Sequence, residues 1–553
     1  MPAGRAPLRL DFWRVVALLA VAAFALLLLY PLARLLISSM TGEEGGSEVL
    51  LRTYVQFFTR KYYYETLIHS LGVSVIVTVL ATLLGAPLAY RASRFDIPGK
   101  LLVRALIVLT FVSPPFIGAY AWILLLGRNG VLTGWLAGLG VRLPSVYGMN
   151  GIVLVLTLQA LPFVFLMVSA GLRTVDQSIE DAAINLGRRP SAVALTVIAP
   201  LIVPSLATGA LLVFVTSLSD FGTPAIIGEN FRMLASQIYT EYVNEHGGNP
   251  AEASALSLIL LVITVGALLW QRSWVRRRSY GQVTVRPLAP RVLAPAARAA
   301  ATAYVYAVVL TASLPLATIV VSSFLKGKGP LITGEFTLQG YAGAIRLPAA
   351  LYNTVVLSTV STVICVAAGA LIGYVVSRRR DRLAGALDAF SMVPYAVAGV
   401  VMGIAIAIAF GGAPFYLGGT AAILVIVYFI RRLPYSIRSV AGMLGQIGAQ
   451  VEEASVNLGV PPGRTFLRVT VPMVTPALIS GALLTFATIA REFNSTVILY
   501  SGSTRTLPVE VFAQVLQGDF ATASVIGTVL IAVSVVPIVV LFRFLDRDET
   551  ALV

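Results

Sequence analysis

Long apolar runs alternate with short polar segments along the whole chain. A membrane-spanning helix needs about 20 mainly apolar residues, and this pattern predicts an all-α polytopic membrane protein with about 12 transmembrane helices. The expected spans are residues 12–38, 67–90, 101–126, 149–172, 196–219 and 253–271 in the first half, and 300–324, 350–376, 386–410, 416–440, 470–492 and 521–543 in the second.

Composition supports a protein that is covered by lipid. Of the 553 residues, 58% are hydrophobic and only 12% are charged, whereas soluble proteins carry roughly 25% charged residues. The net charge of +15 is typical of basic loops that hold the cytoplasmic ends of spanning helices, so we expect membrane lipid and no nucleic acid as a partner. A single cysteine and two histidines exclude an intrachain disulfide and indicate no metal site.

One stretch of the chain occurs twice. Glu180-Asp181-Ala182-Ala183, followed by Gly187, returns as Glu452-Glu453-Ala454-Ser455, followed by Gly459, at a constant shift of 272 positions (180 to 452). The same shift superimposes flanking residues without a gap, among them Leu161-Pro162 on Leu433-Pro434, Pro190 on Pro462, Pro204 on Pro476, and Phe221 on Phe493. The chain therefore consists of two related halves, which we place at residues 1–271 and 300–553, joined by a basic cytoplasmic linker at 272–299.

Basic residues predict the orientation of the helices. With the N-terminus in the cytoplasm, three basic clusters all lie on the cytoplasmic side, as the positive-inside rule requires; they are Arg91/Arg94/Lys100, Arg272/Arg276/Arg277/Arg278 and Arg378/Arg379/Arg380/Arg382. Both termini are then cytoplasmic, and both copies of the repeated stretch lie in cytoplasmic loops. Six spans separate the copies, so the repeat is parallel.

Each copy predicts a short helix that ends in a glycine turn. Ser178 with Asp181 fits a capping box at the helix start, whereas Gln450 at the corresponding position means that the second cap must differ. Gly187 and Gly459 can adopt the positive φ that ends a helix. A short helix with small side chains suits docking into a groove on a partner, one partner per half; the alternative is an amphipathic helix that lies on the membrane.

The repeated pattern resembles the signature loop of type I ABC importer permeases, and the resemblance covers both six-span halves. The pattern is Asp/Glu-Ala-Ala/Ser, three residues, Gly, nine residues and Val-x-Ala/Val-Pro; Asp181, Ser455, Ala199 and Val471 depart from the family's usual residues. In that family the loop is the coupling helix, which sits in a cleft of the ATPase subunit. The resemblance implies this coupling role for Glu180, Asp181, Ala182, Ala183 and Gly187, and for Glu452, Glu453, Ala454, Ser455 and Gly459.

The same resemblance implies partners, location and substrate. It implies two cytoplasmic ATP-binding subunits that hold ATP and Mg²⁺, an extracytoplasmic substrate-binding protein, and a multi-pass position in the inner or plasma membrane. Two fused halves, together with Ser219–Pro224, Phe231 and Ile238-Tyr239, are similar to ferric-iron importer permeases. Fused permeases for thiamine and for 2-aminoethylphosphonate are also similar, so these substrates stay open.

The chain shows no catalytic motif of its own. It lacks the Gly-x4-Gly-Lys-Ser/Thr loop that cradles nucleotide phosphates, so we expect no enzyme activity, no cofactor bound by this chain, and ATP hydrolysis by a separate polypeptide. A competing class is an ion-coupled secondary transporter, because two parallel six-span repeats also suit that architecture. A channel is less well supported, because no filter-like loop occurs.

Charged residues and prolines in the spans are candidates for the translocation pathway. Asp220 and Glu492 are related by the shift of 272 and are expected at the outer ends of their spans, where they either face water or contact the binding protein or a passing cation. Arg431 and Arg432 either extend to the cytoplasmic interface or form a cationic lining that favours an anionic substrate. Pro114 and Pro394 are expected to kink spans three and nine and to line the pathway.

Overall fold

The computed structural model describes residues 11–41, 49–243, 248–277, 288–329, 331–344 and 347–550. In the first half the helices are α1 (Phe12–Phe24), η1 (Ala25–Leu29), α2 (Tyr30–Thr41), α3 (Val49–Thr59), α4 (Lys61–Arg94), α5 (Lys100–Val112), α6 (Pro115–Leu126), α7 (Val131–Gly138), α8 (Met149–Arg173), α9 (Gln177–Asn185), α10 (Pro190–Val193), η2 (Ala194–Ile198), α11 (Ala199–Leu218), α12 (Gly222–Ile227), α13 (Leu234–Val243) and α14 (Pro250–Arg276).

The second half contains helices and one pair of strands, which lies between its first two helices. The elements are α15 (Pro295–Ser322), β1 (Leu325–Lys328), β2 (Leu331–Phe336), α16 (Gln339–Gly343), α17 (Leu347–Arg378), α18 (Arg382–Ala396), α19 (Gly399–Phe410), α20 (Ala421–Gln446), α21 (Gln450–Asn457), α22 (Pro462–Thr465), η3 (Phe466–Thr470), α23 (Val471–Ala490), α24 (Thr496–Leu499), α25 (Leu507–Leu516) and α26 (Phe520–Thr550). The antiparallel hairpin of β1 and β2 pairs Leu325 with Phe336 and was not predicted.

The predicted all-α polytopic fold is confirmed. Within the described ranges, ten helical runs are long and apolar enough to cross a membrane, or eleven if the bent pair α18–α19 counts as one span. The sequence prediction of about 12 is higher, partly because it includes α20. That helix has 26 residues, but Arg431, Arg432 and Arg438 interrupt its apolar run.

Two of the predicted spans are broken. The run 101–126 forms α5 and α6, which are separated by extended backbone at Ser113 and Pro114. The run 386–410 forms α18 and α19, which are bent by 109° where Val397 is extended. The expected kinks are therefore present, with Pro114 at the first break and Pro394 inside α18, three residues before the second.

Three short π-helical turns stand at one fixed distance before a proline. The turns η1, η2 and η3 are followed, at the second residue after each, by Pro31, Pro200 and Pro472. Proline has no N–H to donate within the helix and its ring crowds the preceding turn, and a wider π turn accommodates this locally. Because η2 and η3 are related by the shift of 272, the proline of the repeated pattern has the same structural consequence in both halves.

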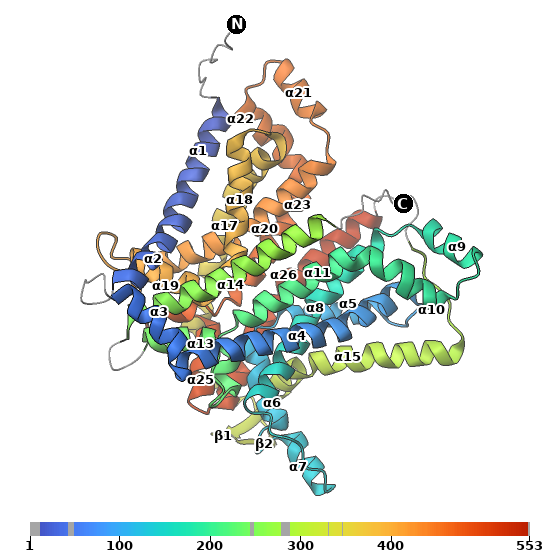
Figure 1. Cartoon of the computed structure of the whole chain (residues 1–553), viewed down its shortest axis with the longest axis vertical. Coiled ribbons are helices and arrows are strands. Elements are labelled where there is room, and N and C mark those ends of the chain that lie inside the picture. Colours follow the sequence, from blue (N-terminus) through green and yellow to red (C-terminus); the bar gives the residue numbers. More distant parts are fainter. Residues whose placement is uncertain are drawn as a thin grey trace.

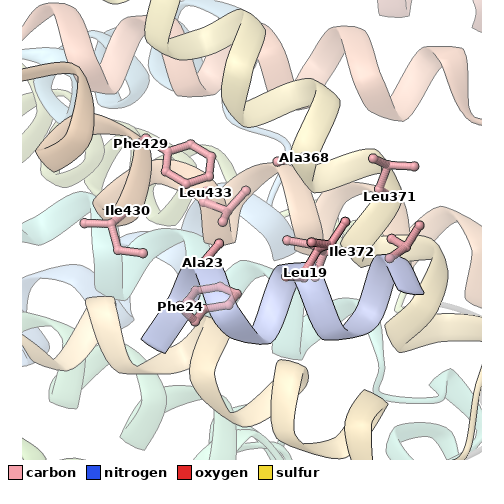
Figure 2. A pocket seen from close by; sticks show the side chains of 11 residues that line it. Leu19, Ala23, Phe24, Ala368, Leu371, Ile372, Phe429, Ile430 and Leu433 are labelled. Carbon is pink, nitrogen blue, oxygen red and sulfur yellow. The ribbon is translucent and has the colours of Figure 1, made fainter. Parts of the chain in front are cut away.

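The first helices of each half pack against the other half. The segment α1–η1–α2 contacts α17, α18, α19 and α20, while α15 contacts α4, α5 and α6. Figure 2 shows the first of these interfaces, where Leu19, Ala23 and Phe24 of α1 lie opposite Leu371 and Leu433, around a cavity of ≈ 190 Å³ that is lined only by apolar side chains. The two halves are consecutive in sequence but interleaved in space.

The molecule has two distinct ends. Figure 1 shows two diverging arms: α4, α8 and α11 lead toward α9, and α17, α20 and α23 lead toward α21. We call the side that carries α9 and α21 the loop end. The opposite side, which carries α7, β1 and β2, is the hairpin end (Figure 1).

Candidate coupling loops and central gate

The first repeated stretch forms α9, and its N-cap is Asp176. The Asp176 carboxylate accepts a hydrogen bond from the Ser178 N–H at 2.9 Å, which is a preferred way to satisfy a free amide at a helix start. The predicted capping box of Ser178 and Asp181 is therefore wrong; Asp181 instead accepts a hydrogen bond from the Gln177 side-chain amide at 2.8 Å. The second helix, α21, has no side-chain cap at Ala449, so the expected difference between the two caps is confirmed.

The glycine turns that follow the two helices are the same. Gly187 has φ of 84° and Gly459 has φ of 85°. In each turn the glycine N–H donates to the carbonyl three residues earlier, at 2.8 and 2.9 Å, and the next N–H donates to the carbonyl five residues before it, at 3.2 Å in both. This pattern is a Schellman motif. A Cβ at either glycine would meet nothing within 4 Å, so the backbone conformation alone requires glycine.

Each loop exposes side chains at matching positions. They include Asp181, Ala182 and Leu186 in the first loop and Glu453, Ala454 and Leu458 in the second; we call these two sets the loop faces. Leu186 is 84% exposed and Leu458 is 85% exposed. Two exposed leucines at equivalent helix ends indicate an interaction surface. Their repetition was visible in the sequence, but the sequence analysis did not single them out.

Glu180 points into the protein and not toward a partner. It is 1% exposed and forms an ion pair with Arg94, at the end of α4, which is also 1% exposed. Arg291, in the described part of the linker, forms a second ion pair with Glu180 at 3.1 Å. The Arg291 N–H also donates to the Arg94 carbonyl at 2.7 Å. Glu180 therefore anchors α9 to α4 and to the linker.

Glu452 anchors α21 in a similar way. Its carboxylate accepts hydrogen bonds from Arg378, at the end of α17, and from the Tyr374 hydroxyl, the shortest of each being 3.1 Å. Arg378 also donates to the carbonyls of Leu444 and Ile447 at 3.1 and 3.0 Å. The acidic pair predicted for partner docking is thus divided in each loop: the first acid is internal and the second acid is exposed.

The two anchoring arginines form a second repeat, which the sequence analysis missed. Arg94 and Arg378 differ by 284 positions, and the same shift superimposes Gly85-Ala86 on Gly369-Ala370 and Tyr90 on Tyr374. This shift differs from 272 because the first half has more residues between the arginine and its glutamate. The separation is 86 positions from Arg94 to Glu180 and 74 from Arg378 to Glu452. A search at more than one shift would have found this match.

The central acidic residues are buried, so of the two alternatives the one in which they face water is wrong. Asp220 is 4% exposed and Glu492 is 5% exposed. The Asp220 carboxylate accepts a hydrogen bond from the Thr223 N–H at 2.9 Å, at the start of α12. Among the residues that the structure describes, Asp220 forms no ion pair.

Glu492, by contrast, lies between two arginines. Arg431 and Arg432 both form ion pairs with it, and their side chains are 14% and 16% exposed. Of the two alternatives for these arginines, extension to the cytoplasmic interface is wrong, because α20 continues to Gln446 and places both arginines midway along the helix. Arg491 donates to the Phe111 carbonyl, so this region holds three arginines and one carboxylate.

An aromatic cluster joins the two halves beside these acids. Phe221 and Phe493, which are related by the shift of 272, stack with ring centroids 5.6 Å apart. Tyr239 of α13 packs on Phe221 at 4.4 Å, and Phe512 of α25 packs on Phe493 at 4.9 Å. Phe116, at the start of α6, adds a fifth ring at 4.4 Å from Phe493. We call these five residues the central aromatic cluster; the sequence indicated Phe221 and Phe493 as a matched pair but not that they meet.

The helix breaks lie next to the same region. Gln159 of α8 donates from its side-chain amide to the carbonyls of Pro114 and Pro115, each at 3.2 Å. Its counterpart in the repeat, Arg431, lies against Gly399 at the start of α19, where a Cβ would meet the guanidinium at 2.9 Å. Each break is thus contacted by a repeat-matched polar side chain, while Pro394 is buried within α18. No cluster of three or more His, Cys, Asp or Glu residues suited to a metal ion occurs among the described residues.

Comparison with known proteins gives the family of both halves. The sequence profile of the family described as "Binding-protein-dependent transport system inner membrane component" matches residues 79–280 and 365–550. The chain is 28% identical over 533 residues to the ferric transport system permease protein FbpB of Actinobacillus pleuropneumoniae, covering 94% of this chain and 76% of that protein.

Two further relatives differ in how much of the chain they cover. The Fe(3+)-transport system permease protein FbpB 2 of Haemophilus influenzae is 24% identical over 506 residues, covering 90% of this chain and 94% of that protein. The molybdenum transport system permease protein ModB of Mycobacterium tuberculosis is 34% identical over 202 residues, covering 34% of this chain and 76% of that protein.

Proposed function

Because the chain belongs to the family of binding-protein-dependent transport system inner membrane components, we propose that it is the permease of an ATP-driven importer for ferric iron. The family makes it a multi-pass membrane transport subunit of an ABC importer, which works with ATPase and substrate-binding partners. Ferric iron is supported by two relatives that cover most of the chain and are named for ferric transport. The family also argues against an ion-coupled secondary transporter.

Two ATP-binding subunits dock on the loop end, one on each loop face. The observation that carries this proposal is the equivalence of the two loops: the same Schellman turn, the same exposed leucine and the same internal glutamate–arginine anchor occur in both halves. ATP and Mg²⁺ are held by those subunits. The loop end is cytoplasmic, both termini lie on that side, and the extracytoplasmic binding protein meets the hairpin end.

Movement of the ATPase subunits reaches the membrane through the buried ion pairs. A partner that moves α9 also moves α4, because Glu180 pairs with Arg94 at the end of that span. Movement of α21 is passed to α17 through Glu452 and Arg378. The role of these four residues is mechanical, since none of them lies on the exposed loop faces.

The central aromatic cluster is the gate of the pathway. In this conformation the two arms diverge at the loop end (Figure 1), and Phe221 packs on Phe493 between the halves. Closure of the ATPase subunits brings α9 and α21 together and separates these rings. Asp220 then becomes available to a passing ferric ion, because hard cations prefer oxygen ligands and no arginine neutralises this carboxylate among the described residues.

The arginines of the second half favour a second candidate substrate. Arg431, Arg432 and Arg491 outnumber Glu492, so the region beside the gate carries excess positive charge. An anionic substrate such as 2-aminoethylphosphonate, or ferric iron carried as an anionic chelate, would be stabilised there. Thiamine, which is a cation, would not.

The test is ATPase activity that depends on the loaded binding protein. The chain is purified with its ATPase partner and a candidate binding protein in lipid, and ferric iron, 2-aminoethylphosphonate and thiamine are compared. We expect stimulation by the iron-loaded binding protein, and loss of stimulation in the double variant Leu186→Asp/Leu458→Asp, while the isolated ATPase keeps its basal rate. If only the phosphonate-loaded binding protein stimulates the ATPase, the substrate is 2-aminoethylphosphonate and not ferric iron. If the chain binds no ATPase, the proposal of an ATP-driven importer is wrong.

A further inference from the structure

A cavity of ≈ 390 Å³ lies at the loop end of the first half, apart from the central aromatic cluster. It is bounded by the end of α4, the start of α5, the end of α8 and Leu288 of the linker. Three arginines line it, Arg94, Arg104 and Arg173, and no acidic residue does. Its remaining wall is largely apolar and includes Val108 and Phe165. The cavity therefore combines positive charge with an apolar surface.

Several polar groups of this cavity lack partners within the described part of the chain. The Nε atom of Arg94 and the Oγ atom of Ser169 are buried and form no hydrogen bond, although the terminal nitrogens of Arg94 bind Glu180 and the Ala289 carbonyl. Arg104 and Arg173 are exposed and make no hydrogen bond or ion pair with any described residue. Arg104 and Arg173 therefore offer unpaired guanidinium groups to the cavity, and a ligand with acceptor oxygens would be stabilised by them.

The second half does not need this arrangement. At the shift of 284, Arg104 corresponds to Asp388, which forms an ion pair with Arg438 at 2.7 Å. At the shift of 272, Leu166, Ser169 and Arg173 correspond to Arg438, Ala441 and Gly445. The same place in the second half is therefore internally neutralised. The unpaired arginines of the first half are not required by the fold.

We propose that this cavity binds a phosphate group, either from the headgroup of an anionic phospholipid or as free phosphate. Arginine guanidinium groups match the geometry of phosphate oxygens. Basic pockets between spanning helices at the cytoplasmic face are suited to anionic lipid headgroups, and the apolar wall can contact an acyl chain. Arg94 contacts both the cavity and Glu180, so the bound phosphate lies beside the anchor of α9.

The test measures lipid bound to the full chain. The permease is reconstituted in nanodiscs that contain phosphatidylglycerol and phosphatidylcholine, then released, and the retained lipid is counted by native mass spectrometry. We expect Arg104→Ala/Arg173→Ala to weaken phosphatidylglycerol retention about 25-fold, from roughly a fivefold loss per arginine. Arg104→Lys/Arg173→Lys should restore most of it. Arg94 is left unchanged, because its loss would also release Glu180.

The matched control is Arg438→Ala in the second half. This change removes a basic side chain at the same end of the molecule, but Arg438 does not line the cavity. Retention of phosphatidylglycerol by this variant should therefore equal that of the unmodified chain. All variants are first compared by thermal unfolding, so that a misfolded protein is not counted as one that fails to bind.

A parallel titration with inorganic phosphate, in phosphatidylcholine nanodiscs, identifies the source of the phosphate group. Binding of phosphatidylglycerol but not of phosphate assigns a lipid, and binding of phosphate that depends on Arg104 and Arg173 assigns a soluble anion; both support the site. If the unmodified chain and Arg104→Ala/Arg173→Ala retain equal phosphatidylglycerol and neither binds phosphate, the proposal is wrong.

Discussion

The two halves place carboxylates at the same positions but balance their charge in different ways. Near the central aromatic cluster, the described residues give Asp220 a hydrogen bond from a backbone N–H and no ion pair, whereas its counterpart Glu492 has two arginines. At the loop end the difference is reversed. Glu180 pairs with two arginines, Arg94 and Arg291, while Glu452 has one arginine and a tyrosine.

This comparison separates what the repeat determines from what it leaves free. The helix ends, glycine turns and aromatic rings occupy matching places, so they belong to the shared scaffold. The additional basic partners, Arg291 in the first half and Arg431 and Arg432 in the second, come from segments where the halves differ, namely the linker and the middle of α20. Excess positive charge consequently lies near the central aromatic cluster in the second half and at the loop end in the first.

The largest difference between the halves should appear when the central carboxylates are neutralised. Glu492→Gln leaves Arg431 and Arg432 without their counter-ion, and loss of one partner from a buried ion pair costs about 3–5 kcal/mol. Asp220→Asn keeps an oxygen that can accept from the Thr223 N–H, so we expect a loss of about 1 kcal/mol or less. Thermal unfolding of both variants in the same nanodiscs measures the difference; equal destabilisation would contradict it.

The two arginines that anchor the loops should differ less in how much free energy their loss costs. Arg94→Ala removes a 1% exposed partner of a 1% exposed glutamate, and we expect a local loss of about 3–5 kcal/mol. Arg378→Ala, at 15% exposure, should cost about 1.5–3 kcal/mol, the range for hydrogen bonds to charged groups. Hydrogen–deuterium exchange of α9 and α21 reports each effect. The ranking would be contradicted if, relative to the unmodified chain, the exchange rate of α21 in Arg378→Ala increased more than that of α9 in Arg94→Ala.

The glycine turns should respond equally, because this part of the repeat is the same in both halves. Gly187→Val and Gly459→Val each place a β-branched residue at positive φ, which costs about 1–3 kcal/mol, and we expect weaker capture of the ATPase while membrane insertion continues. Gly187→Asn is the matched control, since asparagine tolerates this conformation better. The measurement is co-purification with the ATPase; normal transport by the double valine variant would contradict the role of the turns.

The smallest effect on the permease itself is expected at the exposed leucines. Leu186→Ala and Leu458→Ala should change the stability of the chain by less than about 0.5 kcal/mol, as is usual for exposed positions. Each should nevertheless weaken ATPase binding by about 2 kcal/mol, or roughly 30-fold, if the leucine is a hot spot of the interface. Binding of the ATPase to immobilised nanodiscs tests this. Unequal losses at the two leucines would show that the two docking sites differ.

Features whose cause lies within a few residues could be predicted from the sequence. Gly187 and Gly459 end their helices because few other residues adopt positive φ readily, and Pro114 breaks its span because it cannot continue the hydrogen-bond pattern of a helix. The hairpin at residues 325–336 was missed because a search for apolar runs of about 20 residues does not detect four- and six-residue strands.

Features that join distant segments could not be predicted in the same way. The pairing of Arg94 with Glu180 spans 86 positions, and nothing in either segment alone identifies its partner. For Arg431 and Arg432, extension to the cytoplasmic interface was one of two alternatives, and the span was expected to stop at residue 440. The helix continues to Gln446, which moves both arginines to its middle, beside Glu492.

The interleaving of the first helices has a consequence for biosynthesis. Asp11, directly before α1, pairs with Arg379, which is made 368 positions later. At about 5–20 residues per second, the ribosome needs roughly 20–70 seconds to produce that partner. During this interval α1 must persist in the bilayer without its final neighbours, which its apolar composition allows. The helix α1 is therefore synthesised well before the helices of the second half that supply its native contacts.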